Sequence, residues 1–139
     1  KYPVKNYMKY KGNPNNVIFR SGWECRFMTY CDNNPAIVEW SSEEIIILYL
    51  SPKDNMMHRY FPDFWIKVKT ANGFEECLIE VKPKVQTKMP VMKKRKTKRF
   101  IEECITYEVN QAKWAAARAY CEKNNMRFII LTEDDLLHG

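Results

Sequence analysis

Alternation of apolar and polar residues predicts a β-hairpin spanning residues 61–82. The hairpin places six apolar residues on one face: Phe64, Ile66, Val68, Cys77, Ile79 and Val81. Asn72-Gly73 lies between the two runs, and both residues tolerate the positive φ of a two-residue type I′ turn. We therefore predict strands over 61–69 and 75–82 joined at this turn, with the apolar face directed toward a core.

The turn also predicts the register. If Ala71 pairs with Phe74, then Asp63 lies opposite Lys82, and Glu80 shares their face. A one-residue slip would bury these charges. Diagonal cross-strand neighbours have Cβ atoms about 5–8 Å apart, so the carboxylates of Asp63 and Glu80 are expected to be close enough to share one divalent cation.

Periodicity outlines the rest of a single α/β domain. Helical spacing predicts a short helix over 22–31 and a long one over 98–123, and β-type runs predict strands over 45–50 and 127–131. Residues 1–16 are expected to form an extended N-terminal segment. The resulting order is helix, three-stranded meander, helix, strand. At 139 residues and 45% hydrophobic content, there is room for one domain only.

The long predicted helix carries an apolar stripe of Phe100, Ile101, Cys104, Ile105, Ala112, Ala115, Ala116, Ala119 and Tyr120. Its small alanines favour close packing on the sheet. Four further residues of this helix could reach the site or equally stay on the helix surface: Tyr107, Gln111, Lys113 and Trp114. The pattern assigns them no role.

Two carboxylates and a lysine on one sheet face favour metal-dependent hydrolysis of a phosphodiester. A hard cation held by carboxylates and waters neutralises charge on the phosphate and acidifies a bound water; Mg²⁺ suits this role, with Mn²⁺ as a substitute. Lys82 would orient the nucleophile or stabilise the transition state. The alternative is a surface ion pair between Asp63 and Lys82, which would contribute little.

A third carboxylate, Glu24, lies at the start of the first predicted helix. Ser21 is suited to be the N-cap, so Glu24 could complete a capping box with it or could complete a metal site. Glu39, Glu43 and Glu44 flank the next predicted strand and compete for the position of third acid, with Glu43 as the reserve candidate.

Pro62-Asp63 followed by Glu80-Val81-Lys82 resembles the PD-(D/E)XK nuclease superfamily, which has the restriction-endonuclease-like fold. The resemblance implies catalytic roles for Glu24, Asp63, Glu80 and Lys82. It also implies a metal bound by the three carboxylates and by the backbone carbonyl of Val81.

Further motifs extend the resemblance along most of the chain. They include Arg20-Ser21-x-Trp23-Glu24, Trp40-x-x-Glu43, Arg59-Tyr60-Phe61, Lys98-Arg99-Phe100, Lys113-Trp114 and Leu131-Thr132-Glu133-Asp134. In order and spacing they are similar to the head completion nucleases of T-even-type bacteriophages and, more loosely, to nuclease subunits of Tn7-type transposases. This similarity implies endonuclease and exonuclease activity on packaged DNA before the tail joins. It further implies portal or neck proteins as partners, and action in the infected bacterial cytoplasm or at the virion neck.

Basic charge is concentrated in one segment. Residues 82–99 hold nine Lys or Arg and no acid, whereas the rest of the chain holds 14 basic and 17 acidic residues. We predict a mobile basic arm over 83–99 that binds DNA phosphates independently of sequence. Its expected contact residues are Lys84, Lys93, Lys94, Arg95, Lys96, Lys98 and Arg99. The alternative is a solvated linker.

Other features narrow the class of protein. The sequence shows neither a run of about 18 apolar residues nor a leader-like start, so we expect no membrane span and an intracellular location. Five cysteines without a Cys-x-x-Cys pair predict reduced core thiols. His58 is expected in a solvated loop. Two other functions stay open: a DNA-binding module with a vestigial nuclease site, and a structural head-to-tail joining protein.

Overall fold

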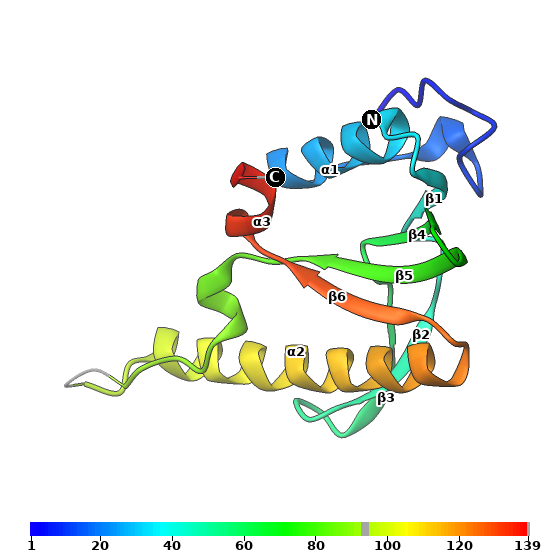
Figure 1. Cartoon of the computed structure of the whole chain (residues 1–139). Helices are drawn as coiled ribbons and strands as arrows, with labels where there is room; N and C mark the ends of the chain where they lie inside the picture. The colour runs from blue at the N-terminus through cyan, green and yellow to red at the C-terminus, as the bar shows by residue number, and fades with distance from the viewer. Residues whose placement is uncertain (93–94, 139) are drawn as a thin grey trace.

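A computed structural model describes residues 1–92 and 95–138 (Figure 1). Its elements in chain order are η1 (Pro14–Asn16), α1 (Gly22–Asn33), β1 (Ile37–Ser42), β2 (Ile47–Ser51), β3 (Met56–Tyr60), β4 (Phe64–Thr70), β5 (Gly73–Val81), η2 (Lys84–Thr87), α2 (Lys98–Lys123), β6 (Arg127–Leu131) and α3 (Glu133–His138). No helix among these residues is long and apolar enough to cross a membrane.

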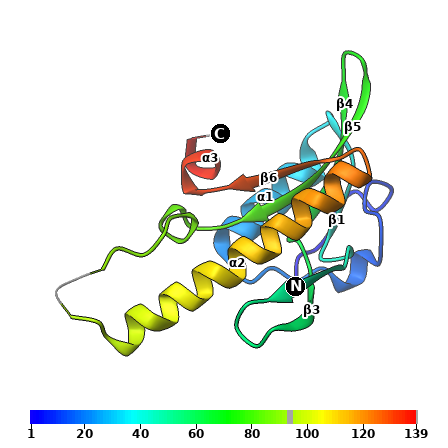
Figure 2. The ribbon, with the colours of Figure 1, turned by 90° about the horizontal axis from the view of Figure 1, so that it is seen from below.

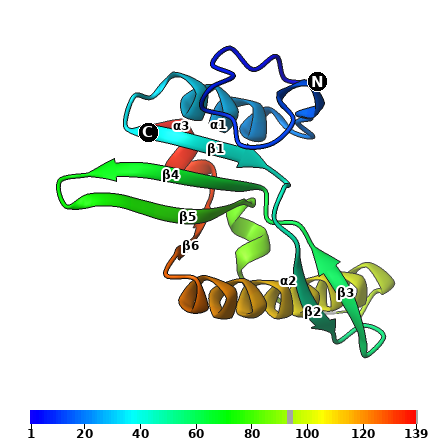
Figure 3. The same cartoon turned by 90° about the vertical axis from the view of Figure 1, so that its right-hand side faces the viewer.

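A four-stranded sheet of order β1-β4-β5-β6 forms the middle layer. β1, β4 and β5 pair antiparallel, whereas β6 runs parallel to β5 after the crossover through α2. α1 and α3 cover one face and α2 covers the other (Figure 1). β2 and β3 form a separate two-stranded sheet that lies against α2 (Figure 3).

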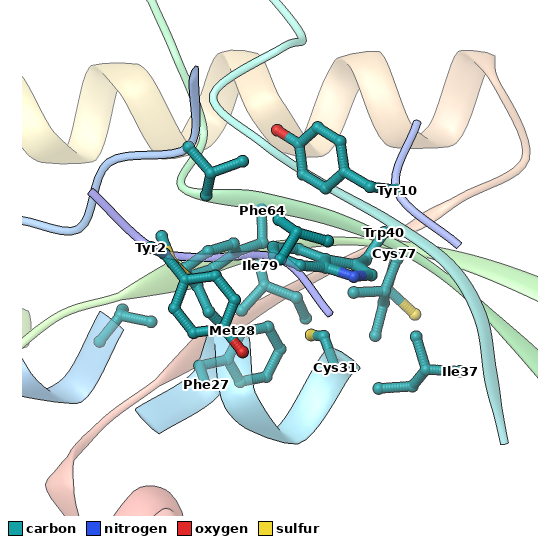
Figure 4. Packing of buried hydrophobic residues seen from close by; sticks show 14 residues of the cluster. Tyr2, Tyr10, Phe27, Met28, Cys31, Ile37, Trp40, Phe64, Cys77 and Ile79 are labelled. Carbon is teal, nitrogen blue, oxygen red and sulfur yellow. The ribbon is translucent and has the colours of Figure 1, made fainter. Parts of the chain in front are cut away.

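Both faces of the main sheet are buried. Phe27 and Cys31 of α1 pack with Phe64 and Ile79 of the sheet (Figure 4), and the rings of Phe27 and Phe64 lie 4.8 Å apart. This confirms the predicted apolar face. The opposite face of the hairpin contributes Trp65 and Leu78 to a second core with Trp114 and Ala117 of α2. By strand alternation these two sheet residues share the face of Asp63, Glu80 and Lys82.

The N-terminal segment joins the first core. Tyr2, Val4 and Tyr10 are buried there, and the ring of Tyr10 meets Trp40 edge-on at 4.8 Å. The backbone amide of Trp40 donates to Lys9, and the amide of Lys11 donates to Trp40, so the segment bonds to the outer edge of β1.

The predicted turn of the hairpin is wrong. Thr70 pairs with Gly73, so the two turn residues are Ala71 and Asn72. Only Gly73 of this turn has a positive φ, +125°, which excludes a type I′ turn. The Thr70 hydroxyl also donates to the Gly73 carbonyl at 3.2 Å. The observed turn differs from the predicted one because the positive φ is at Gly73, which follows the two turn residues, and not at either of them.

The predicted register is therefore wrong by two residues. Phe64 pairs with Ile79. Continuing this register by one residue places Asp63 opposite Glu80 instead of opposite Lys82. Because side chains alternate with a period of two, this shift keeps every side chain on its predicted face. Asp63 and Glu80 thus become direct cross-strand neighbours instead of the predicted diagonal ones.

Two strands and the last helix were not predicted. The strand expected at 45–50 is β2, which pairs with β3 and lies outside the main sheet. β1 occupies the edge position expected for that strand. The strongly apolar run of β2 dominated the pattern, whereas β1 contains Glu39, Ser41 and Ser42. Helix, three strands, helix and strand remain the order of the core, and the predicted fold class is confirmed.

α2 has the predicted bounds, and Ala112, Ala116 and Tyr120 of its predicted stripe pack against the second core. Its buried residues are Asn110, Trp114, Ala117 and Cys121. Ala115 and Ala119 of the predicted stripe are exposed, because the large indole of Trp114 determines which side faces the sheet. The N-terminal half of α2 runs beyond the end of the sheet (Figure 2), which leaves Ile101 and Ile105 exposed.

The cysteines and His58 are also placed. All five cysteines are free thiols, and Cys31, Cys77 and Cys121 are buried, which confirms the predicted reduced core thiols. His58 is exposed but lies in β3 instead of a loop, where its ring bonds Asp54 at 2.7 Å.

Candidate active site

Asp63 connects the ends of three strands. It lies between β3 and β4, and its Oδ2 accepts a hydrogen bond of 2.7 Å from the Val81 amide at the end of β5. The Asp63 carbonyl accepts from the Glu43 amide, just after β1, at 3.1 Å. One carboxylate oxygen is thus fixed by a backbone donor, which orients the side chain before any ligand is present.

Glu80 is buried beside it on β5, with 5% of its surface exposed. The Tyr60 hydroxyl donates to its Oε1 at 2.7 Å, and the Lys82 ammonium lies 3.5 Å from its Oε2. Among the described residues Lys82 forms its ion pair with Glu80, so the alternative of an Asp63–Lys82 pair is wrong. The two-residue shift in register is the reason.

Crowding of these carboxylates changes the acidity of Asp63. Burial and the charge of Glu80 raise the pKa of the Asp63 carboxyl to about 8, with a smaller contribution from Glu24. The Val81 hydrogen bond and the Lys82 charge lower this pKa without offsetting the rise. In the absence of a cation, a proton therefore relieves the repulsion at neutral pH.

We expect this proton to appear in the stability of the metal-free protein. The pKa of Asp63 in the folded state lies above its unfolded value of about 3.9, so protonated Asp63 stabilises the fold below pH 4. This contribution is lost as pH rises from about 4 through about 8. Because the side chain is partly exposed, we expect a loss on the order of 2 kcal/mol.

Urea unfolding in chelator at pH 5 and pH 8.5 measures the effect. Asp63→Asn should remove this part of the pH dependence, so the difference between the two proteins isolates Asp63 from other titrating groups. Equal changes in the two proteins would contradict the raised pKa.

Glu24 forms half of a capping box. The Ser21 hydroxyl accepts from the Glu24 amide at 3.1 Å, which confirms Ser21 as the N-cap of α1. The Glu24 carboxylate, however, accepts from the Arg20 amide at 3.1 Å instead of the Ser21 amide. Its charge contributes to the raised pKa of Asp63, so it lies within electrostatic reach of the pair. A metal-binding role for Glu24 stays a prediction.

The other candidates for third acid are engaged in different contacts. Glu43 pairs with the Arg20 guanidinium and has a positive φ of 55°, an uncommon conformation for a residue other than glycine. Glu39 lies 3.7 Å from Lys67, and Glu44 accepts from the Tyr10 hydroxyl at 3.3 Å. Of these three, Glu43 alone contacts the site, because its backbone amide donates a hydrogen bond to the Asp63 carbonyl.

The donor set suits Mg²⁺. Within residues 1–92 and 95–138, no three His, Cys, Asp or Glu side chains form a ready cage for a metal. What the site offers is two adjacent carboxylates with hard oxygen atoms, Asp63 and Glu80, and the Val81 carbonyl as the predicted further ligand. Mg²⁺ is usually bound through one or two carboxylates and keeps several waters, whereas Ca²⁺ takes six to eight oxygen ligands.

Substituting Glu24 by Gln tests its predicted role. Gln keeps an oxygen that can accept from the Arg20 amide, so we expect the free energy of unfolding to change by less than about 0.5 kcal/mol. If Glu24 is the third acid, single-turnover cleavage of DNA should fall at least about tenfold. Glu43→Gln is the matched control, since it removes one carboxylate at the same edge. Full activity in Glu24→Gln together with a loss in Glu43→Gln would transfer the role to Glu43.

Sequence reasoning missed Tyr60, which fixes Glu80. The available signal was its place in Arg59-Tyr60-Phe61, just before Asp63. Of the residues left without a role on the long helix, Trp114 is 1% exposed and belongs to the core. Lys113 lies near the site carboxylates, whose charges act on it.

The basic segment starts at the site and leads to α2 (Figure 2). Lys84 is held by α3, because its amide donates to Glu133 at 2.7 Å and its ammonium lies 3.0 Å from Asp134. Arg99 pairs with Glu103 within α2. Arg95, Lys96 and Lys98 are exposed, and Lys93 and Lys94 lie outside the described residues. DNA contacts by this segment stay a prediction.

Comparison with known proteins places the chain in a family. Residues 34–133 match the family described as TnsA-like endonuclease N terminal. The chain belongs to this family. It is also 41% identical over 140 residues to the head completion nuclease of Enterobacteria phage T4, covering 98% of this chain and 91% of that protein. No solved structure matches. Both predicted resemblances are confirmed, and Asp63, Glu80 and Lys82 of this TnsA-like chain lie within the matched range, whereas Glu24 precedes it.

Proposed function

We propose that this protein is a metal-dependent DNA nuclease that processes packaged DNA during completion of a phage head, before head and tail join. The observation that carries the proposal is the partly buried pair of carboxylates, Asp63 and Glu80, next to Lys82. Membership in the TnsA-like endonuclease family and the similarity to the T4 head completion nuclease support it. Endonuclease and exonuclease activity are both included in the proposal.

Asp63 and Glu80 would hold Mg²⁺, together with the Val81 carbonyl and Glu24. When bound, the cation would neutralise phosphate charge and acidify a water. The chain orients the ligands in advance: the Val81 amide holds Asp63 Oδ2, and Tyr60 holds Glu80 Oε1. Lys82 is positioned 3.5 Å from Glu80 Oε2 and would donate to the attacking water or to a phosphate oxygen.

The basic segment would guide DNA to the site. It leaves β5 immediately after Lys82, so phosphates bound along 83–99 would lie on the strand that enters the site. Portal or neck proteins are the proposed partners, and the infected bacterial cytoplasm or the virion neck is the proposed location.

Incubation of linear and closed circular DNA with and without Mg²⁺ tests the function. Cutting of the circle would show endonuclease activity, and shortening of the linear DNA from its ends would show exonuclease activity. Asp63→Asn controls for a contaminating nuclease. Binding of DNA without cleavage in Mg²⁺ or Mn²⁺ would refute the nuclease and favour the DNA-binding module. Absence of both would favour the structural joining protein.

Neutralising residues 93–96 with Gln is expected to weaken DNA binding without abolishing cleavage. In the sequence these residues follow Lys82 by about ten positions and are not among the proposed metal ligands, so they would bind phosphates as point charges. Each phosphate that is no longer bound should flatten the slope of log affinity against log salt by about 0.9 on duplex DNA, similarly for unrelated sequences. An equal neutralisation of Lys1, Lys5, Lys69 and Lys123 is the control. An unaltered slope in the 93–96 variant would mean that the segment is a linker or binds protein.

A further inference from the structure

A half-buried lysine, Lys113, reaches the site from α2. The next residue, Trp114, is 1% exposed and anchors this turn of the helix in the second core. The Lys113 ammonium lies 5.7 Å from the ring centroid of Tyr60 and 5.9 Å from that of Tyr49. Both tyrosines are buried residues of the β2–β3 sheet, so two aromatic rings hold the ammonium in place.

Tyr60 connects this lysine to the proposed metal site. Its hydroxyl donates to Glu80 at 2.7 Å while its ring faces the Lys113 ammonium. The pKa of Lys113 is lowered by burial first and by the charge of Lys82 second, and Glu80 and Asp63 raise it. The charges of all three site residues therefore act on Lys113.

Lys113 forms no ion pair with a carboxylate in the described part of the chain. Among the described residues no acidic side chain lies within 4.0 Å of its ammonium, whereas the Lys82 ammonium pairs with Glu80. Partial burial of a cation without a counter-ion costs free energy, which the two rings offset only in part. An apolar side chain of similar length would avoid this cost. The positive charge of Lys113 is therefore suited to binding an anionic group of the substrate.

We propose that Lys113 binds a phosphate oxygen of the cleaved DNA strand next to Asp63 and Glu80; the proposal rests on the nuclease function proposed above. Lys82 from the end of β5 and Lys113 from α2 would then supply positive charge from two elements, which offsets the repulsion between phosphate and carboxylates. Because the rings already restrict Lys113, little side-chain entropy is lost on binding. A hydrogen bond from ammonium to phosphate is charge-assisted and hence strong.

Binding of a short duplex in chelator tests the contact without cleavage. The cut position is first mapped with the wild-type protein, and each phosphate around it is then replaced in turn by a neutral methylphosphonate. We expect Lys113→Met to weaken binding of the unmodified duplex by roughly tenfold to a hundredfold. This penalty should disappear when the neutral group is at the cut or one position from it, because the two changes remove the same interaction.

Two further variants serve as controls. Lys113→Arg keeps the charge and should retain most of the affinity. Lys123→Met makes the same change ten residues along α2, about 15 Å away along the axis, and should bind like wild type. Single-turnover cleavage should fall by roughly 10²-fold in Lys113→Met if the contact persists in the transition state.

The outcomes separate the two proposals. A penalty in Lys113→Met that is the same on every methylphosphonate duplex would overturn the phosphate contact, as would wild-type binding by this variant. If Lys113→Met is unstable, the Lys113→Arg variant replaces it. Binding by Lys113→Arg as weak as that of Tyr49→Leu would also overturn the contact, because the positive charge would then be kept without the affinity. Failure of the wild-type protein to cleave DNA would instead refute the nuclease function.

Discussion

Glu80→Gln is expected to reduce DNA cleavage by at least about 10³-fold while the protein stays folded. Glu80 supplies one of the two negative charges that would hold the cation, and charge stabilisation by a bound metal contributes several kcal/mol to phosphodiester cleavage. About 4 kcal/mol corresponds to 10³-fold in rate. Gln is nearly isosteric and can still accept the hydrogen bond from Tyr60, so the 2.7 Å contact that positions the side chain is kept.

Single-turnover cleavage with enzyme in excess measures this effect independently of DNA affinity. Glu75→Gln is a matched control, because it makes the same change on the same strand at a carboxylate that pairs with Arg127 outside the site. This control should cleave like wild type. Cleavage by Glu80→Gln within tenfold of wild type would show that the carboxylate pair is not the metal site.

Asp63→Asn should lose activity to the same extent but differ in stability. Because the Asp63 carboxyl is crowded by Glu80 and its pKa is raised, neutralising it should stabilise the metal-free protein above pH 8. Higher stability together with lost cleavage would separate a functional role from a structural one.

The sequence predicted which face of the hairpin carries the site, but not which residues lie opposite one another. A two-residue slip preserves the alternation of side chains, so Asp63, Glu80 and Lys82 share a face in either register. The register follows from the turn, where Gly73 has a positive φ and the Thr70 hydroxyl bonds the Gly73 carbonyl. The alternation of apolar and polar residues does not reveal either feature. The consequence is chemical, because the observed register places Asp63 opposite Glu80 instead of Lys82, and Lys82 pairs with Glu80 on its own strand.

Elements formed by long-range contacts were the ones missed. β1 has a mixed sequence and is stabilised by β4 on one side and by residues 9–11 on the other. Tyr60 and Lys113 are 53 residues apart and meet only because β2, the partner strand of β3, packs against α2. Strand propensity largely reflects such packing partners, which are invisible in a local window of sequence.

The largest loss of stability is expected from Asp32→Ala, about 2–4 kcal/mol. Asp32 is fully buried at the C-terminal end of α1, and its carboxylate accepts from the amides of Lys5 at 2.7 Å and Asn6 at 3.0 Å. The Tyr2 hydroxyl adds a third, longer contact. Removing the acceptor leaves these donors without a partner, at about 1–3 kcal/mol for each buried group. Urea unfolding at pH 7 measures the loss.

Asp32→Ala should also affect the site, because the N-terminal segment is linked to it through β1. This segment bonds to β1 at Trp40, and the chain just after β1 presents the Glu43 amide to Asp63. Asp32→Asn keeps one acceptor oxygen and should lose about half as much stability, which makes it the matched control. We expect Asp32→Ala to cleave DNA at 15 °C and to lose this activity at a lower temperature than wild type, in parallel with unfolding. Full stability in Asp32→Ala would show that residues 1–11 are not held through this carboxylate.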